Sequence, residues 1–299
     1  MSSLHTTQFL GLEPEFTAFD TAQIVILPVP YEGGVSYGKG TADAPQAILE
    51  ASHHLELYDE ILDVEPFRIG IATLAPPALP TTPEAVIQTV YESTRACITQ
   101  GKFVVLIGGD HSLSSGYYQA LREYYGQVSV IQLDAHADLR PTYEDNPWSH
   151  ACVMARIREH TSHTLQIGIR SLSLEEAERV KAEEIALCTM HEYRRGNFSL
   201  DAALQNLPDP VFLTLDVDVF DWSAIRNTGT PEPGGFLWDE GLELLQQIFL
   251  AKQVVGVDLV ELAHQEHDRN SPFAAAKLIY KLLGFKYHNV SFVTKENAA

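Results

Sequence analysis

Three kinds of feature are scarce in this chain of 299 residues: cysteine, long apolar segments and clustered basic residues. The three cysteines, Cys97, Cys152 and Cys188, are an odd number without CxxC spacing, which indicates neither a disulfide framework nor a zinc–thiolate site. No apolar run approaches the roughly 20 residues that cross a bilayer, and the first residues show no signal-peptide pattern. We therefore expect a cytoplasmic protein that does not span a membrane.

Negative charge is abundant, since 40 Asp and Glu face 20 Lys and Arg, for a formal net charge of −20. A surface for nucleic acid or anionic lipid needs basic patches, and the longest basic cluster is Arg194–Arg195. We therefore expect neither nucleic acid nor a membrane as a partner. An acidic field favours a small cationic ligand instead, although solubility alone would also account for this charge.

Apolar, β-branched runs recur along the chain and predict strands, most of them buried on both faces because their apolar character is continuous. The runs are Ile24–Val29, Arg68–Ala72, Phe103–Ile107, Val128–Leu133, Leu165–Ile169, Val211–Leu215, Val254–Leu259 and, as an eighth candidate, Val290–Val293. Helical patterns lie between several of them, at residues 82–101, 113–125, 174–184, 239–252 and 272–283. This alternation predicts an α/β fold, a three-layer α/β/α sandwich with a mainly parallel sheet, in a single domain over residues 1–299.

Residues that bind metal ions follow three of the predicted strands, at the edge where open parallel sheets bind their ligands. They are Asp110 and His111 after residues 103–107, Asp134, His136 and Asp138 after residues 128–133, and Asp216 and Asp218 after residues 211–215. In extended backbone the positions i, i+2 and i+4 project on one face. We therefore expect the side chains of each series to point the same way.

Two interpretations of these residues compete. A single Asp or His after a strand is more often a cap or turn residue than a ligand, and Asp110 alone would suit a helix N-cap. Five acids and two histidines at three strand ends are more than turns require, and unpaired buried carboxylates are costly. Because the set holds four ligand carboxylates, two imidazoles and no thiolate, it suits two ions that share ligands and activate water. The residues therefore predict a binuclear metal site and a hydrolytic reaction.

Four motifs resemble those of the ureohydrolases, the arginase and agmatinase superfamily. They are Gly108-Gly109-Asp110-His111-Ser112, Asp134-Ala135-His136-Ala137-Asp138, the DxDxxD run Asp216–Asp221, and TGTPEPGG at residues 228–235. The similarity extends to residues 30–37 and 40–52 and to Asp258–Glu261, so it covers nearly the whole chain and is closest to agmatinases. It implies an arginase-like fold, a homo-oligomer (trimer or hexamer), and hydrolysis of a guanidino compound to urea and an amine.

The resemblance also implies two manganese ions per chain, with nickel or another divalent ion as the alternative. The implied ligands are His111, Asp134, Asp138 and Asp216 for one ion, and Asp134, His136, Asp216 and Asp218 for the other. Asp134 and Asp216 would thus bridge the two ions.

Four positions take further roles from the family. His150 is similar to a mobile histidine that shuttles protons, and Asp138 to the acid that holds the attacking hydroxide and passes its proton to the leaving amine. Glu261 resembles the acid that anchors the substrate guanidinium, beside Thr230. Without the resemblance, His150 would be interpreted as a surface-loop residue, Glu261 as a strand-end acid and Thr230 as part of a turn.

Residues 138–150 are similar to those of bacterial and archaeal agmatinases, so we expect agmatine as the substrate and putrescine and urea as products. Arginases carry an asparagine where this chain has Arg140, which would favour a carboxylate tail if it faced the pocket. Arginine, guanidinobutyrate, aminopropylagmatine and guanidine therefore stay open as substrates, and so does a non-catalytic metal-binding homologue. Trp222, His264 and His267 depart from the family pattern and would alter the pocket rim if they line it.

Overall fold

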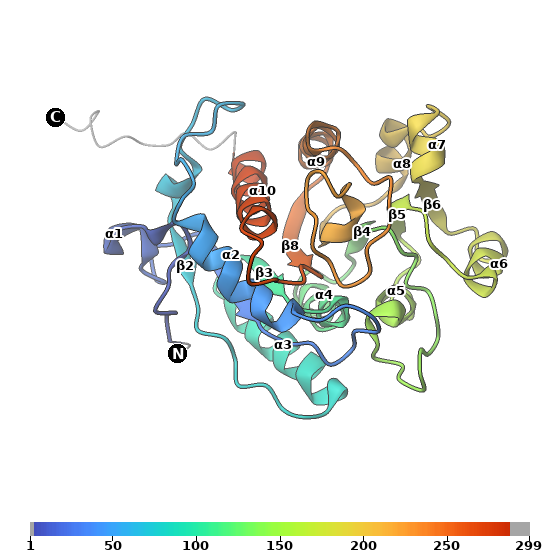
Figure 1. The fold of residues 1–299 in the computed structure, drawn as a ribbon, viewed down its shortest axis with the longest axis horizontal. Helices are drawn as coiled ribbons and strands as arrows, with labels where there is room; N and C mark the ends of the chain where they lie inside the picture. The colour runs from blue at the N-terminus through green and yellow to red at the C-terminus, as the bar shows by residue number, and fades with distance from the viewer. Residues whose placement is uncertain (1–2, 288–299) are drawn as a thin grey trace.

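One eight-stranded sheet, whose strands all run parallel, forms the centre of the computed structural model, which describes residues 3–287. The strands are β1 (Ile24–Val29), β2 (Ile71–Thr73), β3 (Phe103–Gly108), β4 (Ser129–Leu133), β5 (Thr164–Ile169), β6 (Ala186–Thr189), β7 (Val211–Asp216) and β8 (Val254–Val260). Their order across the sheet is β2-β1-β3-β8-β7-β4-β5-β6 (Figure 1). Strands β3 and β4 follow each other in sequence but are not neighbours in the sheet, because β8 and β7 lie between them.

Helices cover both faces of this sheet, which explains why the central strands are buried along their whole length. Alternate residues of one strand enter opposite cores, as Ile24 and Ile26 of β1 do on one side and Val25 and Leu27 on the other. The first core is closed by α2 (Ala44–Ser52), α7 (Met190–Arg194), α8 (Leu200–Asn206), α9 (Trp238–Ala251) and α10 (Asn270–Tyr287). The second is closed by α3 (Pro83–Ile98), α4 (Ser114–Tyr125), α5 (Val153–Arg158) and, at its edge, α6 (Leu174–Ala182).

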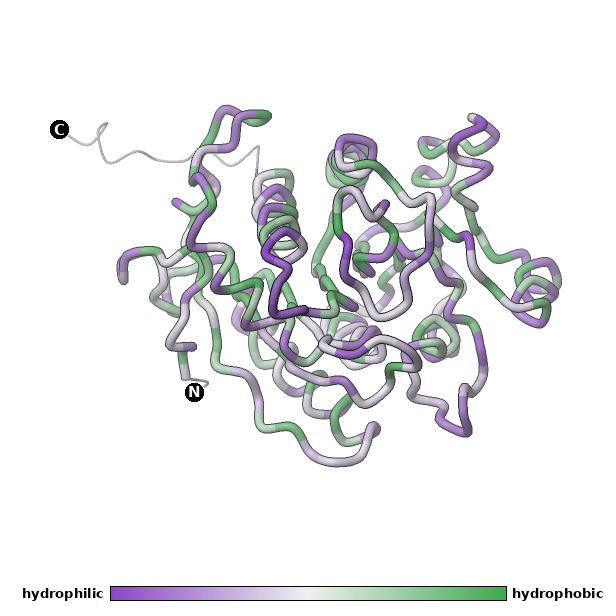
Figure 2. The backbone as a smooth tube through the Cα atoms, in the orientation of Figure 1, coloured by the Kyte–Doolittle hydropathy of each residue, from purple (hydrophilic) through white to green (hydrophobic). Residues whose placement is uncertain are grey.

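The two helical layers are visible in Figure 1, with α9 and α10 on one side of β8 and α3 and α4 on the other. Figure 2 shows apolar residues in the strands and on the helix faces, whereas hydrophilic stretches lie mainly in the peripheral loops. Within residues 3–287, no helix combines the length and the apolar character needed to cross a membrane. The predicted three-layer α/β/α sandwich with a parallel sheet is therefore confirmed.

One predicted strand differs in its bounds, and one strand of the sheet was not predicted. The run Arg68–Ala72 is only partly a strand, because Pro66–Ile69 forms a 3₁₀ helix that ends at Gly70 before β2 begins. Strand β6 was not predicted; it is a short edge strand whose first residue, Ala186, is exposed, so it lacks the apolar run of the central strands. The candidate Val290–Val293 lies outside the described residues.

Helix α10 continues through Gly284 to Tyr287, although the sequence predicts an end at this glycine. Gly284 is buried, and a Cβ atom built on it would lie 2.7 Å from Leu62 Cδ1. The glycine therefore serves a close approach between the helix and residues 59–66 rather than a helix end.

Another close approach shapes the turn that follows β3. The Gly109 N–H donates to the Val29 carbonyl at 3.1 Å, and the Asp110 N–H donates to the Tyr31 carbonyl at 2.9 Å. A Cβ atom on Gly109 would lie only 1.8 Å from the Tyr31 carbonyl oxygen. The absence of a side chain thus allows the ends of β1 and β3 to touch, and the chain then leads directly into His111.

Replacing Gly109 by Ala should destabilise the protein by about 3 kcal/mol, because the added methyl group meets backbone that no rotamer change can move. Urea unfolding followed by circular dichroism measures this loss. Gly101→Asn is the control: Gly101 has φ of 74° but open space around it, and asparagine tolerates this conformation. Equal losses in the two variants would contradict the steric explanation.

Candidate metal centre and active-site pocket

Four neighbouring strands deliver polar side chains to the same edge of the sheet. Strand β3 leads into His111, β4 into Asp134 and β8 into Glu261, while β7 ends on Asp216. Because β3, β8, β7 and β4 are adjacent, residues far apart in sequence meet, and the His111 N–H donates to Glu261 Oε1 at 2.7 Å across 150 positions. The strand order therefore assembles the site.

The same local turn follows β4 and β7. Asp134 Oδ1 accepts the His136 N–H at 2.6 Å, and Asp216 Oδ1 accepts the Asp218 N–H at 2.8 Å. These Asx turns, and not the extended backbone that we expected, set the direction of the alternate side chains. Asp138 has φ of 53°, a left-handed conformation that Asp tolerates, and this turns its carboxylate toward His111.

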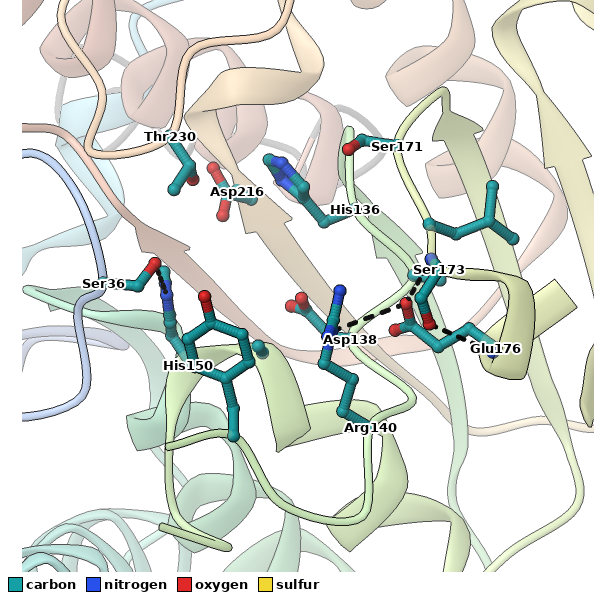
Figure 3. Close-up of a pocket in the computed structure, with 14 residues that line it drawn as sticks. Ser36, His136, Asp138, Arg140, His150, Ser171, Ser173, Glu176, Asp216 and Thr230 are labelled. Atoms are coloured by element: carbon teal, nitrogen blue, oxygen red, sulfur yellow. Dashed lines mark hydrogen bonds and ion pairs between the residues drawn. The ribbon is translucent and has the colours of Figure 1, made fainter. Parts of the chain in front are cut away.

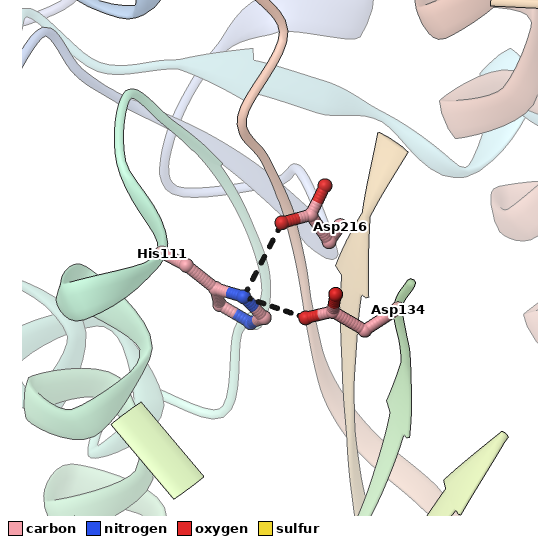
Figure 4. A group of neighbouring side chains, drawn as sticks. All are labelled: His111, Asp134 and Asp216. Atoms are coloured by element: carbon pink, nitrogen blue, oxygen red, sulfur yellow. Dashed lines mark ion pairs between the residues drawn. The ribbon is translucent and has the colours of Figure 1, made fainter. Parts of the chain in front are cut away.

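His111 is the centre of a first group of side chains (Figure 4). Its Nδ1 lies 3.1 Å from Asp134 Oδ2, 3.2 Å from Asp138 Oδ2 and 3.5 Å from Asp216 Oδ2. This buried nitrogen makes no hydrogen bond of good geometry to any described residue. One nitrogen and three carboxylate oxygens thus converge as ligands of a metal ion do.

A second group comprises Asp134, His136 and Asp218. His136 Nδ1 lies 2.9 Å from Asp218 Oδ2 and 3.6 Å from Asp134 Oδ1. Asp134 directs one carboxylate oxygen to each group, so the two groups share this residue. The structure therefore brings together all six side chains that the sequence singled out as ligands.

Negative charge accumulates in the two groups. The carboxylates of Asp134, Asp138, Asp216 and Asp218 are at most 7% exposed, and none is paired with a lysine or arginine among residues 3–287. Burial, together with repulsion between these groups, raises the pKa of the last three, and that of Asp138 to about 7. Oxygen and nitrogen ligands with unbalanced negative charge fit divalent cations.

His150 and Glu261 lie beside these groups. His150 Nδ1 lies 3.2 Å from Glu261 Oε1, and its Nε2 lies 2.9 Å from the Ser36 hydroxyl. Burial lowers the pKa of His150, but the Glu261 carboxylate outweighs this effect and raises the pKa to about 9. Because Glu261 Oε1 also accepts the His111 N–H, Glu261 links the two histidines.

A cavity of about 250 Å³ opens beside the ligand groups (Figure 3). Its lining includes Asp138, His136 and Asp216 of these groups, together with His150 and Thr230. A small molecule in the cavity would therefore contact the proposed ligands and the His150 ring at once.

Arg140 also lines the cavity, and its charge has two nearby partners. The Arg140 Nε lies 3.7 Å from Glu176 Oε2, and the guanidinium carbon lies 5.1 Å from the centre of the Tyr143 ring. Ser171 and Ser173 extend the same part of the lining. This part of the cavity is thus polar, with an acid and a base that offset each other.

Some residues that the sequence singled out lie elsewhere. Trp222 and His267 line one surface cavity and His264 lines another, so these three do not line the 250 Å³ cavity. Asp110 has the structural role that a cap residue would have: it accepts the N–H groups of Ser112 at 3.0 Å and Gly34 at 2.7 Å.

Ser36 and Glu176 are among the cavity residues that the sequence analysis did not single out. Ser36, on the loop after β1, comes next to His150 only through the fold. Glu176 follows Ser173 by three residues, the spacing of a capping box, and the structure shows both hydrogen bonds of that motif. This spacing is visible in the sequence, but only the tertiary structure shows that Glu176 lines the cavity next to Arg140.

Comparison with known proteins gives the family of this chain. The model of the Arginase family matches residues 22–284, a range that contains both ligand groups and Glu261. The chain belongs to the arginase family. The predicted membership of this family is confirmed, and the protein is a ureohydrolase, a hydrolase that acts on a guanidino C–N bond.

Relatives in sequence support this assignment. The N(1)-aminopropylagmatine ureohydrolase of Synechocystis sp. is 39% identical over 288 residues, which cover 93% of each chain. The enzyme of the same name from Thermus thermophilus is 34% identical and covers 94% of this chain and 96% of its own length. The agmatinase of Pyrococcus horikoshii is 31% identical, with 94% and 98% covered.

Solved structures agree with the fold of this arginase-family protein. The agmatine ureohydrolase of Thermoplasma volcanium superimposes with a TM-score of 0.85 at 26% identity, covering 95% of both chains. The proclavaminate amidino hydrolase of Streptomyces clavuligerus gives a TM-score of 0.82 at 26% identity, covering 95% of this chain and 98% of its own.

Replacing Glu261 by Gln should lower the pKa of His150 from about 9 toward the ordinary value of 6.5, because the main carboxylate that stabilises the imidazolium is removed. In the wild type this interaction stabilises the fold fully below pH 6.5 and is lost as the pH rises through 9. NMR titration of ¹⁵N-labelled histidines, in protein free of paramagnetic ions, measures the pKa.

The exposed Glu243→Gln is the control for this titration, because it removes the same charge from helix α9. An unchanged His150 pKa in Glu261→Gln would show that the carboxylate does not control this histidine.

Proposed function

We propose that this ureohydrolase holds two divalent metal ions, Mn²⁺ by preference, and hydrolyses the guanidino group of a linear cationic amine. The observation that carries the proposal is the pair of ligand groups that share Asp134 beside His150 and Glu261. The residues that would hold the ions are His111, Asp134, Asp138 and Asp216 for one, and Asp134, His136, Asp216 and Asp218 for the other. When bound, such a pair of ions activates a water molecule for attack on the guanidinium carbon.

Glu261 would bind the guanidinium. Its Oε2 is buried and has no hydrogen-bond partner among the described residues. Gly229 leaves room next to this oxygen, since a Cβ atom there would lie 3.2 Å away. A guanidinium N–H can donate to Oε2 in a charge-assisted hydrogen bond, and Thr230, the next residue of the loop after Gly229, lines the cavity.

Asp138 and His150 would handle the protons of the reaction. Water adds to the guanidinium carbon, the C–N bond to the alkyl amine breaks, and that amine leaves with a proton. Asp138, which lines the cavity, would orient the attacking water and pass its proton to the leaving amine. His150, whose pKa of about 9 keeps it protonated at neutral pH, would exchange protons with solvent while Glu261 and Ser36 hold its ring.

We place N(1)-aminopropylagmatine first among the substrates and agmatine second. The relatives with that aminopropyl name are 33–39% identical, against 31% for the agmatinase of Pyrococcus horikoshii. Both compounds are linear amines without a carboxylate. Glu176 offsets the charge of Arg140, so the cavity does not require a carboxylate tail. This order reverses the one expected from the motifs alone, which put agmatine first.

Urea release from a panel of guanidino compounds tests the proposal. We expect the Mn²⁺-loaded enzyme to have its highest kcat/KM with N(1)-aminopropylagmatine, then agmatine, and far lower values with arginine and guanidinobutyrate. A preference for a carboxylate-bearing compound would overturn the assignment of the tail. Absence of urea from every compound would overturn the proposed function.

Asp134→Asn should reduce the metal content from about two ions per chain to nearly none, because both groups lose a ligand that they share. His136→Ala should remove mainly one ion. Mass spectrometry of the metal in dialysed protein measures both contents.

Asp221→Asn is the matched control for Asp134→Asn, since it is the same substitution in another family motif, the DxDxxD run, and Asp221 accepts the Ser223 N–H outside both groups. Equal metal contents in the Asp134→Asn and Asp221→Asn variants would remove the basis for shared ligation.

Arg140→Ala should raise kcat/KM for agmatine and N(1)-aminopropylagmatine by about two- to fivefold, the range expected for a charge that is 38% exposed. After this change no arginine offsets the negative charge of Glu176 in the cavity. The binding of substrates with a cationic tail should therefore become stronger, and that of guanidinobutyrate weaker. Arg195→Ala, an exposed site that changes the net charge equally, should leave the ratio of substrates unchanged. A parallel shift in both variants would show that overall charge, and not the cavity, selects the tail.

A further inference from the structure

The second ring nitrogen of His111 begins a buried chain of polar side chains. His111 Nε2 lies 2.8 Å from the Thr214 hydroxyl on β7, and Thr214 Oγ1 lies 3.2 Å from the hydroxyl of Ser114, the first residue of α4. Asp258 on β8 is the direct register partner of Thr214. All four residues are fully buried, and the proposed reaction uses only His111.

Asp258 is an unusual residue for the middle of a central strand. Its Oδ1 accepts the Leu215 N–H at 3.3 Å, whereas its Oδ2 has no hydrogen-bond partner of good geometry among the described residues. Burial raises the pKa of Asp258, while the His111 ring and the hydroxyls of Ser114 and Thr214 lower it. A carboxylate buried at such cost requires donors, and the two hydroxyls are the donors at hand.

The chemistry of these groups determines which one donates and which one accepts in each hydrogen bond of the series. An ionised carboxylate only accepts, and each hydroxyl has a single proton to donate. If Thr214 donates its one proton to Ser114, and Ser114 donates in turn to the Asp258 carboxylate, the Thr214 oxygen must accept the hydrogen bond from His111 Nε2. The proton of the ring then lies on Nε2, and the Nδ1 lone pair points at the oxygens of the first ligand group.

We propose that Asp258, acting through Ser114 and Thr214, is a positioning residue that keeps the His111 proton on Nε2 and so leaves Nδ1 to bind one metal ion. Without the carboxylate, Thr214 can turn its proton toward Nε2, which then accepts a hydrogen bond. The proton of the His111 ring then lies on Nδ1, the nitrogen that should bind the metal ion. The inference rests on the proposed function only for the presence of the ion. It predicts that Asp258 affects the binding of only one of the two ions, because His136 is not part of this series of hydrogen-bonded side chains.

Binding of Mn²⁺ alone to the full-length protein tests the inference, with free Mn²⁺ followed by electron paramagnetic resonance. We expect Thr214→Val and Asp258→Asn each to weaken one of the two binding steps by about 10- to 100-fold, and to leave the other nearly unchanged. Thr214→Ser, which keeps the hydroxyl, should retain wild-type affinity. The double variant should be no weaker than Thr214→Val alone, because both changes interrupt the same chain.

The buried Thr94→Val in α3 is the matched control, because it removes a threonine hydroxyl far from the metal groups. Unchanged affinities in Asp258→Asn, equal weakening of both steps, or a Thr214→Ser variant as weak as Thr214→Val would each overturn the inference. Should Asp258→Asn fail to fold, the three threonine variants still decide.

No substrate enters these measurements, so the two proposals can fail separately. A protein that binds Mn²⁺ in the expected pattern but releases no urea would overturn the proposed function and keep the role of Asp258. Urea release by the wild type, together with unchanged Mn²⁺ affinities in Thr214→Val, would overturn the role of Asp258 and keep the proposed function. A protein that binds no Mn²⁺ would overturn both.

Discussion

Repulsion among four carboxylates, buried together at one edge of a parallel sheet, is the constraint on which the site depends. Asp134, Asp138, Asp216 and Asp218 come from only two strand ends, and burial makes their charges expensive. The fold tolerates them because two imidazoles, the N–H groups of the Asx turns and, by our proposal, two divalent ions stabilise the charge. Any change to this balance acts on stability and reaction together.

Strand β8 connects most of the remaining machinery to this charge cluster. Glu261, the residue after β8, accepts the His111 N–H and contacts the His150 ring, and its Oε2 has no hydrogen-bond partner among the described residues. Asp258, three residues earlier, lies behind His111 and opposite Thr214. Because β8 is inserted between β3 and β7, it can reach a histidine on one side and a threonine on the other. By our proposal, one strand thus positions a metal ligand, a proton carrier and the residue that binds the substrate.

The reaction and the choice of substrate are separated in space. Groups at the strand ends would carry out the reaction, whereas the loop after β4 supplies Arg140 and Tyr143 to the cavity and the first turn of α6 supplies Glu176. Loops exchange side chains without disturbing the sheet, which is why a tail preference can change while the metal ligands stay. In our proposal, the pairing of Arg140 with Glu176 is the feature that allows the cavity to accept a cationic tail.

The sequence by itself determined the class of fold, the central strands and six side chains that cluster in the structure, because continuous apolar runs and the motifs after them are local patterns. It did not determine the short edge strand β6, the Asx turns in place of extended backbone, or the partnership of Ser36 with His150. Nor did it decide whether Trp222, His264 and His267 line the pocket, and the structure places them at two other surface cavities. Contacts across as many as 150 positions depend on which strands are neighbours, and only the tertiary structure decides that order.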